Sequence, residues 1–215
     1  MKKTRTRFAP SPTGYIHIGN IRSAIYPFLI ARQAGGQFIL RIEDTDQARF
    51  VEGATELILD TMRWLHLDWD EGPIKGGPFA PYVQSKRKDI YIKWAKKLIA
   101  DGRAYADDTT SEQIEAYRQE DEAKKIPYLY RNYCFFSSSE WKEGLPIRFK
   151  TIPKEYSWHD EVMGDIHTGP EVCDDIILIK KDGMPTYNFA HIIDDTLMEC
   201  SHITRGVEYL SSTPN

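Results

Sequence analysis

The sequence has 215 residues, enough for one large domain or two small ones with a sizeable buried core. Its formal net charge of −4 argues against indiscriminate binding to nucleic acid. The three cysteines are far apart and lack metal-ligand spacing, so we expect neither disulfides nor a structural zinc site. No apolar run approaches the length of a membrane span, and no signal peptide follows the first residues. The sequence therefore predicts a cytoplasmic protein without membrane segments.

The N-terminal part alternates between strand and helix signals. We expect a strand near 4–9, a helix near 19–34, a strand over 37–42 and a helix over 52–65. Helices between short apolar strands indicate a parallel sheet with crossover connections. Residues 72–81 are rich in proline and glycine, which predicts a boundary there.

Two further helices are predicted over 85–100 and 111–124, the second with Thr109 and Glu112 as a capping box. The first of them lies in a segment from Lys86 to Arg103 that holds seven basic and two acidic residues. Charge alone favours a solvated helix face, and a phosphate-facing stripe is the alternative. The aromatic residues that follow are interpreted as packing rather than as base-stacking platforms: Tyr128, Tyr130, Tyr133, Phe135, Phe136 and Trp141.

The C-terminal part has a β texture until one last helix. We expect strands over 147–152, over 161–166 across a Met163–Gly164 turn, and over 176–180. A helix over 185–198 and a short strand over 202–205 complete the predicted elements.

The strongest candidate site lies where the first strand gives way to the first helix. A helix N-terminus after a strand offers unpaired backbone N–H groups and a positive dipole end, which suit a phosphate. Gly19 lacks a Cβ where a nucleotide could approach the backbone, and His17 and Asn20 can donate hydrogen bonds to phosphate oxygens. Alone, this short motif is a weak signal, because a histidine near a helix start is more often a cap or a surface group.

The longer pattern resembles the glutamyl branch of the class I aminoacyl-tRNA synthetases. Five segments match that branch in order: RFAPSPTGYIHIGN (7–20), RIEDTD (41–46), WLHLDWDEG (64–72), PTYNFA (185–190) followed by Asp194 and Asp195, and RGVEYLSSTP (205–214). The first segment has Asn20 where the family's tetrad usually ends in histidine. The resemblance extends over nearly the whole chain and is weakest between 107 and 141.

This resemblance implies an α/β fold, a Rossmann-like parallel sheet interrupted by an inserted α+β connective, acceptor-stem-binding subdomain. The implied boundaries are 1–80 for the first half of the catalytic domain, 81–184 for the insertion and 185–215 for the return to the sheet. The family's second, lysine-bearing signature loop and its anticodon-binding domain would lie beyond Asn215. We therefore expect an N-terminal portion that is weak or inactive alone.

The implied activity is a glutamate–tRNA ligase, which uses ATP to activate L-glutamate and transfers it to the 3′ end of tRNA(Glu). Mg²⁺ is expected together with ATP, and the protein is expected to be a monomer. Zinc is not expected, because Ala106 and Asp108 stand where zinc-bearing relatives have cysteines.

The resemblance also assigns site residues. Arg7 and Arg205 match the family's glutamate-binding arginines, Glu43 matches the acid that receives the α-ammonium, and Tyr187 matches the tyrosine that closes the side-chain pocket. Ala9 and Ser11 would line the amino-acid site, and Glu208 would face the ATP ribose. The catalytic residues would be His17 and Asn20, which with Gly19 also bind ATP.

Each assignment has an ordinary structural alternative. An arginine that ends a strand is usually a surface ion pair, Glu43 could pair with Arg41 or cap the next turn, and His191 is interpreted as a packed histidine.

Three alternative functions stay open. A glutaminyl enzyme is disfavoured because Arg205 would place a cation against a neutral amide. A glutamyl-Q tRNA(Asp) synthetase-like paralogue, which modifies a tRNA base nucleoside and usually binds zinc, is a second candidate. A catalytically incompetent fragment that binds ligand or RNA is the third.

Overall fold

The computed structural model describes residues 3–133 and 140–214. Its chain divides into two compact units. Unit 1 contains Met1–Asp89 and Phe189–Val207, and unit 2 contains Ile90–Asn188 and Glu208–Asn215. Unit 1 is therefore discontinuous in sequence, since most of unit 2 lies between its two parts.

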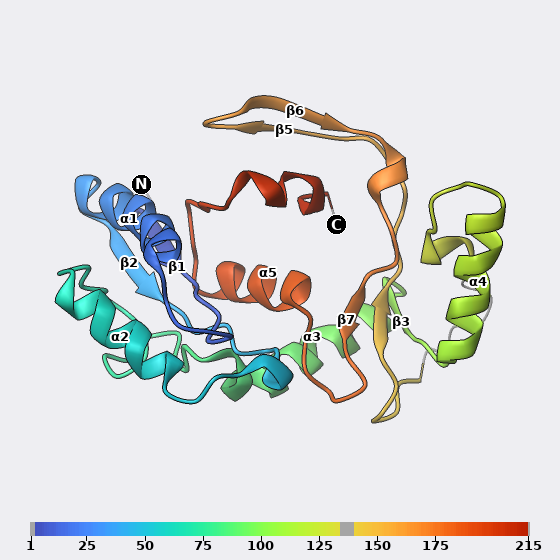
Figure 1. Ribbon diagram of the computed structural model, residues 1–215, viewed down its shortest axis with the longest axis horizontal. Coiled ribbons are helices and arrows are strands. Elements are labelled where there is room, and N and C mark those ends of the chain that lie inside the picture. Colours follow the sequence, from blue (N-terminus) through green and yellow to red (C-terminus); the bar gives the residue numbers. More distant parts are fainter. Residues whose placement is uncertain (1–2, 134–139, 215) are drawn as a thin grey trace. The chain divides into compact units, whose positions relative to one another are not determined.

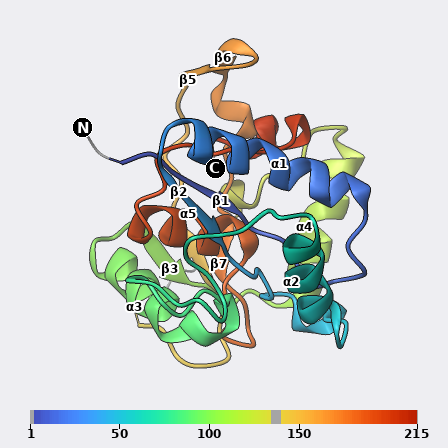
Figure 2. The ribbon, with the colours of Figure 1, turned by 90° about the vertical axis from the view of Figure 1, so that its left-hand side faces the viewer.

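Unit 1 is built on two parallel strands, β1 (Arg5–Phe8) and β2 (Gln37–Leu40), joined by helix α1 (Ile18–Gln33), as Figure 1 shows. In the side view of Figure 2, α1 runs beside these strands. The register pairs Phe8 with Leu40. Helix α2 (Ala54–Trp64) follows, and most of helix α5 (Tyr187–Leu197) also belongs to this unit. The predicted strand–helix–strand–helix order is confirmed.

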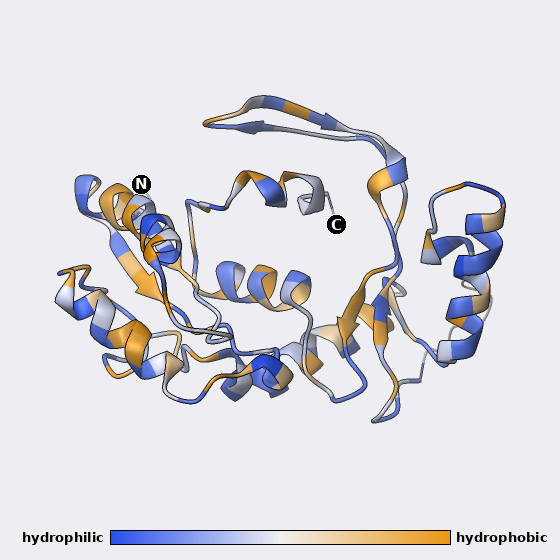
Figure 3. Cartoon of the chain, in the orientation of Figure 1, coloured by the Kyte–Doolittle hydropathy of each residue, from blue (hydrophilic) through white to orange (hydrophobic). Residues whose placement is uncertain are grey.

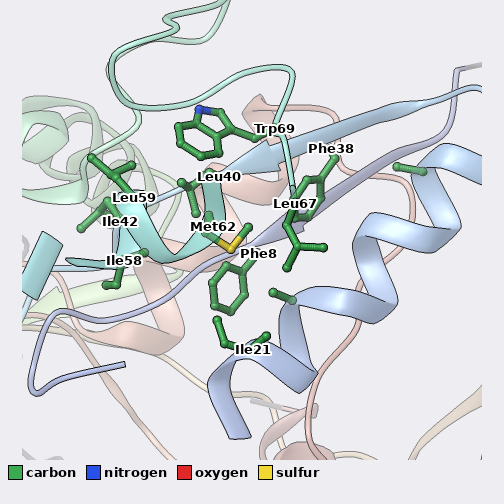
Figure 4. Close-up of a cluster of buried hydrophobic side chains, with 12 residues drawn as sticks. Phe8, Ile21, Phe38, Leu40, Ile42, Ile58, Leu59, Met62, Leu67 and Trp69 are labelled. Atoms are coloured by element: carbon green, nitrogen blue, oxygen red, sulfur yellow. The ribbon is translucent and has the colours of Figure 1, made fainter. Parts of the chain in front are cut away.

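The two faces of this small sheet have different neighbours, because successive side chains of a strand point to opposite sides. One face carries the hydrophobic core of Figure 4, in which side chains of β1 and β2 pack with those of α1 and α2: Phe8, Ile21, Ala24, Phe38, Leu40, Ile58, Leu59 and Met62 among them. Burying each large side chain contributes about 1.5–3 kcal/mol. On the other face, Ile39 packs with Tyr82 and Met198. That second face also receives the odd-numbered residues of β1.

Unit 2 combines a three-stranded antiparallel sheet with two helices and a hairpin. The strand order is β3–β4–β7, with β3 at Ala104–Ala106, β4 at Ile147–Phe149 and β7 at Ile177–Ile179. The helices are α3 (Lys88–Ala100) and α4 (Ser111–Ala123). Figure 3 colours α4 mostly hydrophilic, and the side chain that α4 buries is Asp121. The predicted helices are all present within about three residues.

The hairpin of unit 2 differs from the prediction. It pairs β5 (Tyr156–Asp160) with β6 (Gly164–Thr168), so the turn lies at 161–163 and not at Met163–Gly164. The carboxylate of Asp160 accepts hydrogen bonds from the backbone N–H groups of Val162 and Met163 at 2.9 and 2.8 Å. Gly164 has a φ of 76°, which favours glycine as the residue that begins the second strand. The two hydrogen bonds to the Asp160 carboxylate therefore fix the turn, and with it the register between β5 and β6.

Two other predicted features were wrong, and one strand was missed. Helix α4 is capped one residue later than expected, by Thr110 with Gln113. Residues 202–205 form no strand; instead, the N–H groups of Ser201 and His202 both donate to the carbonyl of Arg5, which satisfies them without a ladder. Strand β3, which is only three residues long, was not predicted.

The aromatic residues of unit 2 pack on one another, as interpreted. The rings of Tyr117 and Tyr133 stack at a centroid distance of 4.4 Å, and Tyr128 stacks on Tyr133 at 6.0 Å. Tyr130 is 3% exposed. Phe135, Phe136 and Cys134 lie outside the described residues. Within 3–133 and 140–214, no helix has both the length and the apolar character needed to cross a membrane.

Candidate functional site

The second face of the unit 1 sheet carries a cluster of buried charges where β1 and β2 end. Arg7 lies on β1, and Arg41 and Glu43 follow β2 at alternate positions, so all three share the face opposite the hydrophobic core. Helix α5 supplies Asp194 and Asp195 to the same cluster. Arg7 and Glu43 are each 5% exposed, which excludes the alternative of a surface ion pair for Arg7.

Arg41 is the centre of this cluster and has no exposed surface. Its Nη1 donates to Asp195 at 2.7 Å, while Nη2 and Nε donate to Oε1 of Glu43 at 2.7 and 3.2 Å. Arg7 shares Asp195, because its Nε donates to both carboxylate oxygens at 3.1 Å. Nη1 of Arg7 donates to the carbonyl of Thr204 at 3.1 Å. One aspartate thus connects the two arginines.

Asp194 anchors the other side of the cluster and is fully buried. It accepts hydrogen bonds at 2.8 Å from both Arg87 Nε and Gln84 Nε2, and it lies 3.7 Å from Nε of Arg41. Arg87 is therefore a buried structural cation, so the basic segment 86–103 is not uniformly a solvated face. Lys93, Lys96 and Lys97 on α3 are exposed, as predicted for that segment.

Burial and charge act in opposite directions on the acids of this cluster. Burial favours a raised pKa for Asp195, but the Arg41 and Arg7 guanidinium groups outweigh it and hold that pKa below its usual value. For Glu43, burial wins over the attraction of Arg41 and Arg7, and its pKa is raised. Burial acts to lower the pKa of Arg41, yet the carboxylates around it raise that pKa and keep the guanidinium charged.

Glu43 and Arg7 each keep one atom without a hydrogen bond to any described residue. Glu43 accepts three hydrogen bonds on Oε1, the third from Gln84 at 3.4 Å, and within the described chain Oε2 accepts none. Nη2 of Arg7 likewise has no partner among the residues described. The alternative that Glu43 pairs with Arg41 is therefore confirmed, but the pairing occupies one oxygen only. An open anionic acceptor beside an open cationic donor suits a ligand that carries both an ammonium and a carboxylate.

The start of α1 forms a second arrangement of predicted site residues. His17 is the N-cap residue: its Nδ1 accepts a hydrogen bond from the N–H of Gly19 at 3.1 Å. The N–H of His17 in turn donates to Oδ1 of Asn20 at 3.1 Å. Because Nδ1 is an acceptor, the proton of the neutral imidazole lies on Nε2, and the exposed ring presents a donor. The side chain of Asn20 therefore completes a capping box with His17.

Gly19 is required by the position of the His17 ring. A Cβ on Gly19 would lie 2.9 Å from Cε1 and 3.0 Å from Nδ1 of His17, closer than such contacts allow. The sequence predicts that Gly19 makes room for a nucleotide, and the structure shows that it also makes room for the capping imidazole.

The comparisons with known proteins identify the family. Residues 3–215 match the family model described as tRNA synthetases class I (E and Q), catalytic domain. The chain belongs to this class I family. Its expected α/β, Rossmann-like fold is confirmed, because a glutamate tRNA ligase from Elizabethkingia meningosepticum, solved in complex with its amino acid, superposes with a TM-score of 0.89. That structure is 39% identical and matches 98% of this chain and 45% of its own.

Curated relatives carry the same name. A glutamate–tRNA ligase of Clostridium botulinum (strain Hall) is 51% identical over 220 residues, covering 99% of this chain and 45% of the relative. One from Clostridium kluyveri is 49% identical, covering 100% of this chain and 46% of the relative. The chain thus spans about half the length of the curated relatives that it matches.

The remaining predicted residues of this class I domain lie in both units. Ala9 is partly buried and Ser11 exposed in the segment between β1 and α1, and Arg205 is partly buried near the end of unit 1. Tyr187 and Glu208 belong to unit 2, where the ring of Tyr187 lies 5.8 Å from that of Tyr209. His191 on α5 is 8% exposed.

Sequence reasoning quoted Arg41, Asp194 and Asp195 as parts of family motifs but gave them no role. A signal was present, because two consecutive acids follow the apolar helix segment Phe189–Ile193 and need partners if they are buried with it. No group of three or more potential metal ligands occurs in the part of the chain that the structure describes.

Proposed function

We propose that this chain is the amino-acid-activating part of a glutamate–tRNA ligase. It binds L-glutamate and ATP, forms glutamyl-adenylate with release of pyrophosphate, and presents the glutamyl group to the 3′ end of tRNA(Glu). The observation that carries the proposal is the pair of open atoms in unit 1, Oε2 of Glu43 and Nη2 of Arg7. The names of the relatives supply the identity of the amino acid and of the RNA.

Each end of glutamate has a matching group. The substrate ammonium donates to Oε2 of Glu43, and one substrate carboxylate accepts from Nη2 of Arg7. Arg205 receives the second carboxylate, and Ala9, Ser11 and Tyr187 line the pocket. Charged recognition of this kind rejects glutamine, because an amide loses a charge-assisted hydrogen bond of about 1.5–3 kcal/mol.

The chemistry needs orientation and charge stabilisation rather than a covalent protein intermediate. An α-carboxylate oxygen of glutamate attacks the α-phosphorus of ATP, the new P–O bond forms, and the bond to the β-phosphate oxygen breaks. The Nε2–H of His17 donates to a phosphate oxygen whose charge grows in the transition state. The start of α1 adds the positive end of its helix dipole, Asn20 fixes His17, and Glu208 holds the ribose. Mg²⁺ enters with ATP, held by phosphate oxygens and water.

The chain spans about half the length of its relatives, so we propose amino-acid activation for this part and transfer to tRNA for the whole protein. Ground-state binding of glutamate rests on contacts within the chain and is retained. We place the protein in the cytoplasm as a monomer.

The test is isothermal titration of this chain with glutamate and with ATP, before and after Arg205→Ala. We expect glutamate affinity to fall by about tenfold or more and ATP affinity to change little. The control is Arg63→Ala, whose exposed ion pair with Asp60 lies on α2. Equal loss of both ligands in a folded variant would contradict the role of Arg205.

Two further measurements separate the neighbouring functions. ATP–pyrophosphate exchange with added tRNA shows activation if the chain is an enzyme and none if it is a binding fragment. Elemental analysis is expected to show no stoichiometric zinc, because the described residues hold no cluster of ligands. Zinc that survives mild chelation would favour the base-modifying paralogue.

A further inference from the structure

We propose that Arg41 is a positioning residue of the amino-acid site, which sets the orientation of Glu43 toward the substrate ammonium and, through Asp195, that of Arg7 toward a carboxylate. This inference rests on the proposed function of the same site. Arg41 acts through its neighbours and does not touch the substrate, because its side chain has no exposed surface.

The first argument is the geometry of one rigid fork. Nε and Nη2 of Arg41 both donate to Oε1 of Glu43, so the guanidinium fixes that oxygen and leaves Oε2 without a bond from Arg41. Nη1 holds Oδ1 of Asp195 at 2.7 Å. A lysine carries a point charge at one atom and cannot hold two acids in a fixed plane.

The second argument is the charge balance of the cluster. Three arginines, Arg7, Arg41 and Arg87, face three carboxylates, those of Glu43, Asp194 and Asp195. Removing the charge of Arg41 leaves two cations for three buried acids, and Glu43 is an acid whose pKa burial already raises. A protonated Glu43 has lost the charge that attracts an ammonium. The loss of Arg41 therefore removes recognition of the ammonium before it removes anything else.

The third argument is a comparison with Arg5, two residues before Arg7 on the same strand. Arg5 is also buried, and its Nη1 and Nη2 hold the two oxygens of Glu71 at 2.7 and 3.0 Å. Tyr82 donates to Glu71 as well, at 2.6 Å. Both Nη atoms of Arg5 therefore donate to one acid, Glu71, which is not a site residue. Arg5 is therefore the matched control for a buried, ion-paired arginine.

The experiment compares L-glutamate with glutarate, which has the same two carboxylates but no ammonium. Dissociation constants for both, and for ATP, are measured by titration of wild type, Arg41→Lys, Arg41→Gln and Arg5→Lys at pH 6 and pH 8. We expect wild type to prefer glutamate and both Arg41 variants to lose about tenfold or more of that preference. ATP affinity is expected to change less than about threefold. In Arg41→Gln, the preference for glutamate over glutarate should fall more at pH 6 than at pH 8. In Arg41→Lys, which keeps the charge, the loss of preference should be the same at both pH values.

The control separates positioning from general damage. Arg5→Lys is expected to lower the melting temperature but to keep the ratio of glutamate to glutarate affinity. An unchanged ratio in Arg41→Lys would overturn the proposal for Arg41. Absence of glutamate binding in folded wild type would instead overturn the proposed function.

A second variant keeps the test decisive if the Arg41 variants do not fold. Asp195→Asn is nearly isosteric and breaks the charged link between Arg41 and Arg7 from the α5 side. It is expected to raise the dissociation constants of glutamate and glutarate alike, because the carboxylate arm loses its orientation. Unchanged constants would overturn the proposed link.

Discussion

Each unit of the molecule contains a buried network of arginine and carboxylate, and the two networks differ in whether every carboxylate oxygen accepts a hydrogen bond from a described residue. In unit 1, Arg41 is surrounded by acids, and the cluster keeps an oxygen of Glu43 and a nitrogen of Arg7 without partners among the described residues. In unit 2, Arg148 is the central cation, and all four oxygens of its two neighbouring acids, Asp107 and Asp175, accept hydrogen bonds.

The unit 2 network is closed by aromatic and backbone partners. Arg148 Nε donates to Asp107 at 2.6 Å, and its guanidinium lies 3.5 Å from the ring centroid of Tyr130. Tyr130 donates its hydroxyl to the other oxygen of Asp107 at 2.7 Å. Asp175 accepts from Tyr105 and from the N–H of Thr151, both at 2.8 Å. Within the described residues, every carboxylate oxygen of this network therefore accepts a hydrogen bond.

The difference teaches how to tell a site from a structural ion pair. Burial acts to raise the pKa of Asp107, but hydrogen bonds from Tyr130 and Arg148 outweigh it and lower that pKa. The pKa of Glu43 stays raised despite two bonds from Arg41. A buried carboxylate with both oxygens hydrogen-bonded is already stabilised, whereas one with an open oxygen holds a charge that a ligand can stabilise further.

The largest effect should come from breaking the closed network. Arg148→Met would leave the carboxylate of Asp107 buried without a cation, which destabilises the protein by about 3–5 kcal/mol. The measurement is thermal or urea unfolding. Arg103→Met, which removes an exposed cation over the ring of Phe149, is the control and should cost less than about 1 kcal/mol. Similar losses in both variants would show that the Arg148 network is not the source of stability.

A pH series should separate Glu43 of unit 1 from Asp107 of unit 2, because their pKa shifts have opposite signs. The raised pKa of Glu43, which faces Arg41, Arg7 and Asp195, means that it takes up a proton at a pH above the usual value of about 4.3. Glutamate affinity should therefore fall as pH is lowered toward that value, by about tenfold for each pH unit below the pKa of Glu43. Titration between pH 8 and pH 5 measures it.

The pKa shift of Asp107 has the opposite sign to that of Glu43. Its lowered pKa gives stability that is present above the unfolded value of about 3.9 and is lost as pH falls through the folded pKa. Unfolding of unit 2 should thus be insensitive to this group over the range in which glutamate binding changes. A glutamate affinity that does not weaken as Glu43 takes up its proton would contradict the role of Glu43.

The smallest effect is expected at the exposed start of α1, where no buried network exists to break. Gly19→Ala should leave stability within about 1 kcal/mol, because alanine favours a helix while its Cβ displaces the His17 ring. ATP affinity should fall by about threefold to tenfold, because the His17 ring leaves its capping position. Gly14→Ala is the control, since a Cβ there meets no atom within 4 Å. A loss in Gly14→Ala as large as that in Gly19→Ala would reject the explanation.

Much of this arrangement could be predicted from the sequence. Apolar periodicity located the helices, and ordered motifs located Arg7, His17 and Glu43 at the ends of their elements. Local signals failed where a single side chain decides the geometry, as at Asp160, whose carboxylate moved the hairpin turn.

Long-range pairing was the other limit. Arg41 and Asp195 are 154 residues apart, and no local pattern says that one aspartate joins Arg41 to Arg7. The burial of Arg87 was hidden for the same reason, since its partner Asp194 is 107 residues away. These contacts depend on how α5 packs on the sheet, which periodicity does not specify.

The separation between Arg41 and Asp195 has a consequence for biosynthesis. At about 5–20 residues per second, the ribosome needs roughly 8–30 s to add the 154 residues between them. During that interval the nascent chain contains Arg7, Arg41 and Glu43 but neither aspartate of α5, while residues 90–188 emerge as an unbroken segment. The inserted unit can therefore begin to fold first, and the charged cluster of unit 1 acquires its native contacts only after that unit has been synthesised.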